Sequence, residues 1–289
     1  MLALPSETVV LEKMVAWANA QTDIRALILT SSRTRPDGPV DLLSDYDLIL
    51  AVTDAERWGR EGGWLSDYGA LMVLWGDEGE LLGHVTYFRG AVYQNYVKAD
   101  YTVWSDALLE RVGEAPVLPD ELDVGYRVLV DKDGRTASWK PPSYRAHIPV
   151  RPTEAEYRAL VEEFWWTTTY VAKSLWRDDI VFAKFCLDHD LKLEALRRLL
   201  EWRIELDHGW NVKPGVWGRG LKRLLPADLW TELANAYVGP DVEDNWAALE
   251  RTVTLFRRVA KEVGDALGFA YPQIVDDQVS VYLNAIRRM

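Results

Sequence analysis

The stretch Ser44-Asp-Tyr-Asp-Leu-Ile-Leu-Ala-Val52 decides how the first half of the chain folds. The apolar run after Asp47 predicts a buried strand, and residues i and i+2 of a strand face the same way, with Cα atoms about 6–7 Å apart. Asp45 and Asp47 therefore project side by side at the start of this strand. Two unpaired carboxylates repel each other there and are costly to desolvate. A divalent cation resolves this, and Mg²⁺ prefers carboxylate oxygens together with phosphates.

A third acidic residue, Asp100, opens a later predicted strand, Asp100-Tyr-Thr-Val-Trp104. Sites that transfer phosphoryl groups with two metals commonly add such a ligand. Because Asp100 follows one strand pattern and begins another, we expect it at an edge of the sheet. An isolated Asp-x-Asp is more often a solvated strand end, so the assignment of Asp45, Asp47 and Asp100 to a Mg²⁺ site depends on the residues upstream.

The upstream stretch is Leu29-Thr-Ser-Ser-Arg-Thr34. Ser32 and Arg33 follow an apolar strand pattern, and such a junction offers backbone N–H groups and hydroxyls to phosphate oxygens. The planar guanidinium of Arg33 also matches phosphate geometry. A Ser-Arg pair alone is usually an ordinary turn. Ser32 lies 13 positions before Asp45, with strand patterns on both sides, and this combination predicts a phosphate-binding site.

Short β-type segments alternate with turn signals up to about residue 150, and helical periodicity follows. Thr153 and Glu156 form the sequence pattern of a capping box, which marks the first helix of the second half. We therefore expect an α+β fold, with a mixed sheet in a domain of residues 1–150 and a helical bundle in residues 151–289. The predicted strands are Ile24–Thr30, Tyr46–Val52, Ala70–Trp75, His84–Arg89, Val92–Val97, Tyr101–Trp104 and Tyr126–Val130. The predicted helices cover residues 7–21, 153–176, 179–207, 228–237, 242–267 and 276–288.

The composition limits the possible partners. The formal net charge of −12 disfavours nucleic acid and favours a cationic small molecule. No apolar run reaches the roughly 18 residues that span a bilayer, and the first residues lack the pattern of a signal peptide. The one cysteine cannot form an internal disulfide. We expect a cytoplasmic protein with no membrane partner, either a monomer or a homodimer.

Ser31-Ser-Arg33, Asp45-Tyr-Asp47 and Asp100 resemble the nucleotidyltransferase pattern of the polymerase-beta-like superfamily. More closely, the chain resembles the bacterial aminoglycoside 6-adenylyltransferases, which modify streptomycin. The family usually has Gly where this chain has Ser31, and a Cβ there narrows the approach to a triphosphate. The resemblance implies a two-domain enzyme with both domains contributing to ATP and acceptor binding. Further stretches that carry it are Val52-Thr-Asp54, Leu129-Val-Asp-Lys-Asp133, Glu163-Phe-Trp165 and Thr169-Tyr-Val-Ala-Lys173.

The first helix of the predicted bundle carries a second group of candidates. Glu162 or Glu163, Trp166, Tyr170 and Lys173 recur at steps of three and four, so they share one helical face. The resemblance implies that Lys173 holds the ATP phosphates and that the acidic and aromatic residues meet a cationic acceptor. The ordinary interpretation is that the rings are core and that Lys173 extends to water.

A glycine-rich loop, residues 211–220, adds Lys213 as a candidate ATP-binding residue, although a plain connection between helices explains it equally well.

The sequence thus predicts Mg²⁺-dependent transfer of AMP from ATP to a hydroxyl of an aminoglycoside, with streptomycin as the expected acceptor. Asp100 is expected either as a third metal ligand or as the general base. A nucleotidyltransferase that acts on a protein or an RNA, and a non-catalytic nucleotide sensor, stay open as alternatives. Ser31 favours the sensor, whereas three convergent carboxylates favour an enzyme.

Overall fold

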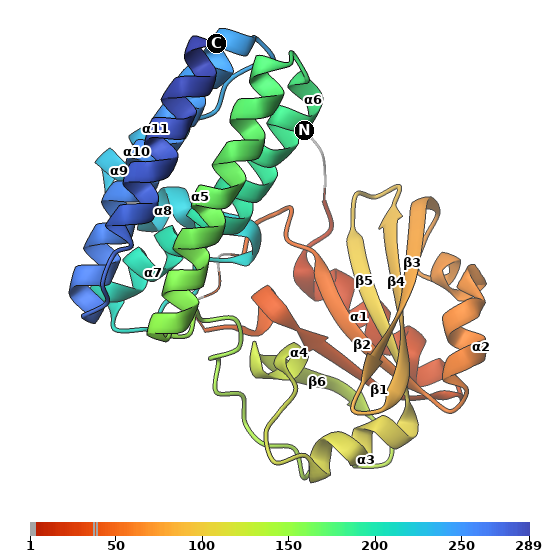
Figure 1. The fold of residues 1–289 in the computed structure, drawn as a ribbon. Coiled ribbons are helices and arrows are strands. Elements are labelled where there is room, and N and C mark those ends of the chain that lie inside the picture. The colour runs from red at the N-terminus through yellow and green to blue at the C-terminus, as the bar shows by residue number, and fades with distance from the viewer. Residues whose placement is uncertain (1–3, 37, 39) are drawn as a thin grey trace. The chain divides into compact units, whose positions relative to one another are not determined.

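The fold is taken from a computed structural model, which describes residues 4–36, 38 and 40–289 (Figure 1). The chain divides into two compact units, Met1–Ala146 and His147–Met289. The first unit is built on a β-sheet and the second is helical, so the fold class is α+β, as predicted. The sequence-based boundary at residue 150 lies in the same connecting segment.

The sheet of the first unit has six strands in the order β3-β4-β5-β2-β1-β6. Only β2 and β5 pair in parallel, and the other neighbours are antiparallel, which makes the sheet mixed. The strands are β1 (Ile24–Thr30), β2 (Tyr46–Val52), β3 (Leu71–Leu81), β4 (His84–Tyr93), β5 (Lys98–Ser105) and β6 (Tyr126–Asp131). The helical segments around them are α1 (Glu7–Ala20), η1 (Ser31–Thr34), α2 (Ala55–Arg60), η2 (Gly62–Asp67), α3 (Asp106–Glu114) and α4 (Asp120–Asp123).

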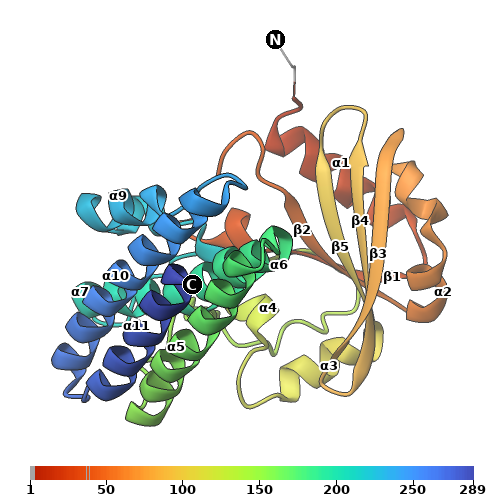
Figure 2. The same cartoon turned by 45° about the horizontal axis from the view of Figure 1, so that its top comes forward.

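Alternate residues of the central strands bury their side chains in two different cores. On β2, Leu48 and Leu50 join the core that contains residues of α1, whereas Ile49 and Ala51 join the core that contains residues of α3. The same alternation on β5 sends Tyr101 to the α1 core and Trp104 to the α3 core. The sheet therefore has helices on both faces, and any residue of β2 or β5 can be assigned to a face by counting (Figures 1 and 2).

Three details of the strand prediction need correction. The predicted strands His84–Arg89 and Val92–Val97 are wrong as separate strands, because β4 runs unbroken through Gly90 and ends at Tyr93. The strand predicted to end at Trp75 continues as β3 to Leu81, through an acidic and exposed half that carries no apolar signal. Asp100 is also not at a sheet edge, because β5 begins at Lys98 and lies between β4 and β2.

The second unit packs long helices around one core. Helix α5 (Glu154–Trp176) begins with the predicted capping box of Thr153 and Glu156. Phe164 of α5 stacks on Phe256 of α10 with ring centroids 3.5 Å apart, which fixes the contact between these helices. Helices α5, α10 and α11 run side by side in both views (Figures 1 and 2). The remaining elements are α6 (Ile180–Lys184), η3 (Phe185–Leu196), α7 (Arg197–His208), η4 (Val216–Gly218), α8 (Leu221–Leu224), α9 (Ala227–Asn235), α10 (Val242–Leu267) and α11 (Gln273–Arg288).

Within the described part of the chain, none of the helices is both long enough and apolar enough to span a membrane.

Candidate active site

Two of the predicted catalytic carboxylates lie on neighbouring strands in direct register. In the parallel pairing of β2 with β5, Asp47 is the Cα partner of Asp100. Adjacent strands lie about 4.8 Å apart. Counting along both strands places Asp47 and Asp100 on the face that also carries Ile49 and Trp104, the α3 side of the sheet. Asp45 precedes β2 by one residue, so all three carboxylates belong to the start of the parallel pair.

Lys98 lies among these carboxylates and was not predicted. Its Nζ donates to Asp45 Oδ2 at 2.6 Å and to Asp100 Oδ2 at 2.8 Å. Burial lowers the pKa of Lys98, but the hydrogen bonds to the two carboxylates outweigh it, and the pKa is raised overall. The spacing of Lys98 and Asp100 is i and i+2, which puts both on one face of β5. That spacing could have identified Lys98 from the sequence.

The fold opposes the ionisation of Asp47. Burial raises its pKa, and the negative charges of Asp100 and Asp45 raise it further, while a hydrogen bond from the Ser31 hydroxyl and the charge of Lys98 act in the other direction. The net shift is upward. A pKa raised by burial and like charge at one strand end is typical of a functional site.

Asp100 has one satisfied and one unsatisfied oxygen. Lys98 binds Oδ2, whereas Oδ1 is buried without a hydrogen-bond partner. A buried acceptor without a partner costs about 1–3 kcal/mol. Gly90, the Cα partner of Asp100 on β4, makes room for this oxygen, since a Cβ on Gly90 would lie 3.1 Å from Oδ1. The site therefore contains an acceptor that a cation or a substrate proton can satisfy.

The oxygen donors fit Mg²⁺ in chemistry but do not form a complete metal cage. Among the described residues, no three Asp, Glu, His or Cys side chains come close enough together to hold a metal ion. Mg²⁺ is commonly bound through one or two carboxylates with substrate phosphates supplying other ligands. Asp45 and Asp47, at the start of β2, match this requirement. The Lys98 ammonium supplies positive charge to Asp45 and Asp100.

The turn that follows β1 carries the predicted phosphate-binding residues. Ser31–Thr34 forms a short 3₁₀ turn, η1, directly after Thr30. Ser31 has φ of +64°, in the left-handed region that favours glycine. For a residue with a Cβ this conformation costs about 1–2 kcal/mol. The conformation explains why a glycine suits the position. The hydroxyl that serine adds there makes a hydrogen bond with the Asp47 side chain. Ser32 follows on the same turn, half-buried.

Arg33 is engaged within the first unit. Its guanidinium donates to the backbone oxygens of Asp45 and Ser44, at 2.9 and 2.6 Å, and to Glu7 Oε2 at 2.8 Å. It also stacks on the Tyr46 ring, 3.9 Å from the centroid, and only 6% of its side chain is exposed. These contacts make Arg33 a positioning residue for the segment that carries Asp45. Phosphate binding by Arg33 stays a prediction, and it would require these contacts to rearrange.

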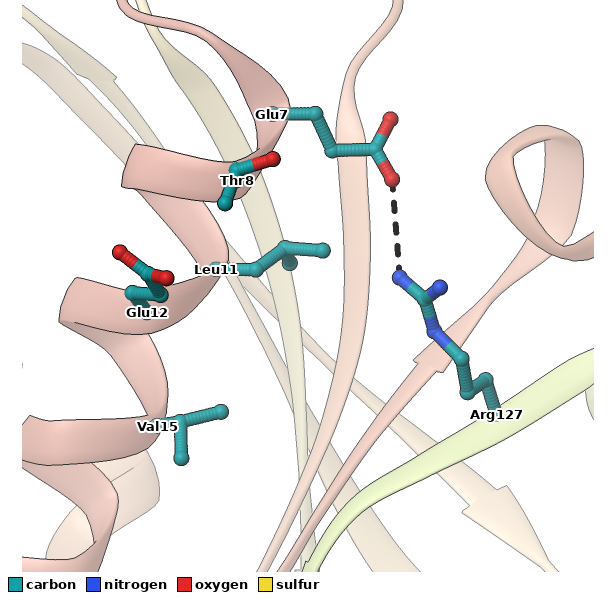
Figure 3. A pocket seen from close by; sticks show the side chains of 6 residues that line it. All are labelled: Glu7, Thr8, Leu11, Glu12, Val15 and Arg127. Carbon is teal, nitrogen blue, oxygen red and sulfur yellow. Dashed lines mark ion pairs between the residues drawn. The ribbon is translucent and has the colours of Figure 1, made fainter.

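A groove of about 350 Å³ lies beside this network, between α1 and Arg127 of β6 (Figure 3). Its lining includes Glu7 and Arg127, whose Oε1 and Nη2 are 3.5 Å apart (Figure 3). Glu7 thus bridges Arg33 and Arg127. The groove does not include Asp47 or Asp100, so it is separate from the carboxylates.

In the second unit, the predicted residues of α5 lie together on one helical face. Trp166 and Tyr170 are in ring contact at 6.1 Å, and Lys173 Nζ lies 4.7 Å from the Tyr170 centroid. Trp166 is 65% exposed, so it is not a core residue. Glu163 is exposed, whereas Glu162 is half-buried and accepts from Arg158 Nε at 2.7 Å. The carboxylates, rings and ammonium form a mixed surface, and their roles stay predictions.

Lys213 lies half-buried in the loop between α7 and η4. It is in the second unit, as are the α5 residues. Its assignment to ATP binding also stays a prediction.

The mixed sheet, the paired carboxylates and the Ser-Arg turn define the class of protein as a nucleotidyltransferase. Comparison with known proteins narrows the class: the sequence model of the family described as streptomycin adenylyltransferase matches residues 4–286. The chain belongs to this family, a family of nucleotidyltransferase enzymes.

Similar proteins span nearly the whole chain. An aminoglycoside 6-adenylyltransferase of Campylobacter jejuni is 29% identical over 283 residues, which cover 96% of this chain and 94% of the relative. An aminoglycoside 6-adenylyltransferase of Bacillus subtilis (strain 168) is 29% identical over 289 residues, covering 97% and 98%. A crystal structure of an aminoglycoside 6-adenyltransferase from Bacillus subtilis aligns with a TM-score of 0.46 at 26% identity, covering 98% and 99% of the two chains.

Proposed function

We propose that this enzyme transfers AMP from ATP to a hydroxyl of an aminoglycoside, with streptomycin as the acceptor. The observation that carries the proposal is the register of Asp47 with Asp100 on adjacent parallel strands, beside Lys98 and the turn at Ser31–Thr34. Convergent carboxylates of this kind serve phosphoryl transfer, where positioning and electrostatic stabilisation supply most of the catalysis.

In the proposed reaction, an acceptor hydroxyl oxygen forms a bond to the α-phosphorus of ATP. The bond from that phosphorus to the bridging oxygen of the β-phosphate breaks, and pyrophosphate leaves with the electron pair. Asp100 accepts the hydroxyl proton at a carboxylate oxygen, which makes Asp100 the general base. The unpartnered Oδ1 supports this role, because it has unused acceptor capacity.

Asp47 and Asp45 are the proposed holders of Mg²⁺, with Asp100 in contact. When bound, the ion would neutralise charge on the triphosphate and on the leaving group. Two features support this assignment. Asp47 has a raised pKa because burial and neighbouring carboxylates oppose its charge, and a cation would relieve that opposition. The Lys98 ammonium also already attracts two of the carboxylates, so the site favours positive charge.

The proposal of an aminoglycoside acceptor rests on the relatives and on charge. Two relatives are named aminoglycoside 6-adenylyltransferases, and each covers over 95% of this chain. The chain has a net charge of −12, which attracts a polycation. The α5 face adds an exposed Glu163 and an exposed Trp166, a pair suited to guanidinium groups by charge and by stacking. Nothing comparable in the described residues favours a protein or RNA acceptor.

Mass spectrometry tests the proposal directly. The protein is incubated with ATP, Mg²⁺ and a panel of aminoglycosides, and the products are examined for an added AMP. We expect an adduct on streptomycin and stoichiometric pyrophosphate. An adduct on a different aminoglycoside would show that the acceptor is not streptomycin and would still support AMP transfer to an aminoglycoside. Binding of ATP without any adduct on the panel would support the sensor alternative.

A further inference from the structure

The outer edge of strand β3 is an exposed apolar surface of the first unit. β3 is the first strand of the sheet, and among the described residues it pairs only with β4. Four consecutive side chains, Met72, Val73, Leu74 and Trp75, are between 51% and 61% exposed. Consecutive residues of a strand point to opposite faces. Both faces of β3 are therefore apolar and uncovered over this segment, next to a row of unpaired backbone groups.

The opposite edge of the sheet is protected. β6 is only six residues long, and none of its large apolar side chains is exposed. Arg127 of β6 pairs with Glu7 of α1 at that edge. Proteins usually shield edge strands by short length, charge or cover, because an open edge pairs with other chains. Only the β3 edge lacks such protection, and only over part of its length.

The charges on β3 show which part of the strand is left open. The second half of β3 carries Asp77, Glu78 and Glu80, all exposed. Like charges placed directly opposite each other in a sheet are destabilising. The acidic half is therefore protected against pairing with another copy, whereas Leu71–Trp75 carries no charge. The open segment ends at the acidic half on one side and at Leu71, where β3 begins, on the other. Its register with β4 is irregular between Leu71 and Val73.

We propose that Leu71–Trp75 of β3 is a dimerisation surface whose partner is the same segment of a second copy of this chain. The two segments pair antiparallel about a two-fold axis at Val73, so that Leu71 lies opposite Trp75, Met72 opposite Leu74, and Val73 opposite its own copy. In this register Asp77 lies beyond the start of the other strand. An axis at Gly76 would instead set Asp77 opposite Trp75 and Glu78 opposite Leu74, which would bury unpaired charge.

The pairing leaves the candidate active site open. β4 and β5 separate β3 from β2, so Asp47 lies on a strand that the dimer does not touch. A closed two-fold interface of this kind uses one patch on both subunits. The proposal is independent of the acceptor and of the AMP transfer itself. Because the paired segment is short, the dimer should form in a concentration-dependent way.

The chain allows a clean cross-linking test. Its one cysteine, Cys186, is buried. Opposite residues of antiparallel strands have Cα atoms about 4.5–5.5 Å apart, within the range of a disulfide. We expect Val73→Cys to form a covalent dimer under mild oxidation. Val117→Cys is the matched control, since Val117 is 73% exposed but lies in the loop between α3 and α4, outside Leu71–Trp75. It should form no covalent dimer under the same conditions.

Sedimentation velocity gives the second measurement. The apparent mass of the wild type should rise from 33.0 kDa to twice that value as the protein concentration increases. Val73→Lys and Leu74→Lys should both remain monomeric. Their thermal unfolding and their turnover per subunit should equal those of the wild type. A wild type that stays monomeric to about 100 μM would overturn the proposal. So would a dimer that survives both lysine substitutions, or Val73→Cys cross-linking no faster than Val117→Cys.

Discussion

At Asp47, burial and the charge of Asp100 favour the neutral carboxyl, whereas metal binding requires the carboxylate. The residue lies on β2 with Asp100 as its partner in register, and its pKa is raised. A group whose folded-state pKa is raised stabilises the fold below its unfolded pKa and loses that contribution as pH rises through the folded pKa. The ionised Asp47 of the metal-free protein is therefore a source of instability at neutral pH.

Replacing Asp47 by Asn should separate stability from activity. The variant should unfold a few degrees higher than the wild type at pH 7 without metal, because the amide carries no charge to desolvate. The difference should shrink as pH falls through the raised pKa of folded Asp47 and disappear below 3.8, the ordinary pKa of Asp, where the wild-type carboxyl is protonated in both states. Transfer of AMP should fall at least about a hundredfold. Thermal unfolding measured across pH and a turnover assay check the two parts.

Asp120→Asn serves as the control for Asp47→Asn, because Asp120 is exposed at the start of α4. A stability difference for Asp47→Asn that is the same at every pH would contradict the role of ionisation.

Lys98 offers a second residue-scale test, because its ammonium and a Mg²⁺ ion compete for the same oxygens. The Nζ atom binds Asp45 Oδ2 and Asp100 Oδ2. Lys98→Met keeps the aliphatic stem and removes the charge. The metal-free variant should be less stable at neutral pH, since the carboxylates lose their counter-ion. Added Mg²⁺ should raise its unfolding temperature more than that of the wild type.

The measurement for Lys98→Met is thermal unfolding with a Mg²⁺ titration, and Asp47→Asn provides the comparison that should respond least to Mg²⁺. Equal responses of the wild type and Lys98→Met would show that the ammonium and the metal do not share ligands.

These residues also show where sequence reasoning reached its limit. Asp45, Asp47 and Asp100 were predicted from residue type and from strand spacing, and the structure brings Asp47 and Asp100 into register. Lys98 was not predicted, because a metal site in the sequence is indicated by acidic residues and a lysine is not a metal ligand, although Lys98 and Asp100 are spaced i and i+2. The contacts of Arg33 with Ser44, Asp45 and Glu7 could not be read from the sequence, because they depend on how the segment before β2 folds back.

At the scale of elements, local patterns predicted the segments but not their pairing. The bounds of β1 and β2 follow from apolar runs with a charged or turn residue at each end, and α10 follows from its long helical periodicity. β4 was divided in the prediction because Gly90 resembles a turn signal. In the sheet, Gly90 instead makes room for Asp100, a contact between strands that no local pattern contains. The parallel pairing of β2 with β5 is likewise a non-local property.

Helix α5 carries the prediction that belongs to this scale. Lys173 lies half-buried on the face with Trp166 and Tyr170, its Nζ 4.7 Å from the Tyr170 ring. If it binds ATP phosphates, Lys173→Ala should weaken ATP binding about tenfold or more, because a charged hydrogen bond contributes about 1.5–3 kcal/mol. Acceptor binding should change little. Isothermal titration calorimetry with ATP and with streptomycin measures both.

The second unit provides a matched control for Lys173→Ala. Lys261 Nζ lies 5.1 Å from the Tyr271 ring, so Lys261→Ala removes the same kind of cation–ring contact elsewhere. Equal ATP affinities for the two variants would show that Lys173 does not bind the ATP phosphates and is an ordinary surface residue.

For the whole molecule, net charge and the acceptor are linked. The chain carries 45 acidic and 33 basic residues, so its field favours the approach of a polycation from any direction. A long-range field of this kind is screened within about 8–10 Å near physiological ionic strength. A local contact with a carboxylate is screened less when it is partly buried. Varying the salt concentration and replacing single carboxylates therefore distinguishes two contributions to acceptor binding: the long-range field of the whole chain and contacts with particular carboxylates.

The last prediction uses this separation on the acceptor. Streptomycin should bind more weakly as salt rises, and Glu163→Gln should raise the KM for streptomycin several-fold while ATP binding stays unchanged. Glu162→Gln should have a smaller effect, because Glu162 already accepts from Arg158 at 2.7 Å, whereas Glu163 is exposed. Steady-state kinetics over a range of salt concentrations measure both effects.

Glu154→Gln controls for net charge, since it removes the same charge from an exposed position on the same helix. If Glu154→Gln and Glu163→Gln raise KM equally, the field of the whole chain attracts the acceptor and the α5 face has no specific part in binding. If only Glu163→Gln raises KM, and the increase shrinks at high salt, a particular carboxylate contacts the drug. A KM for streptomycin that is independent of salt would contradict the acidic acceptor site altogether, because carboxylate–guanidinium pairs at an exposed position must be screened.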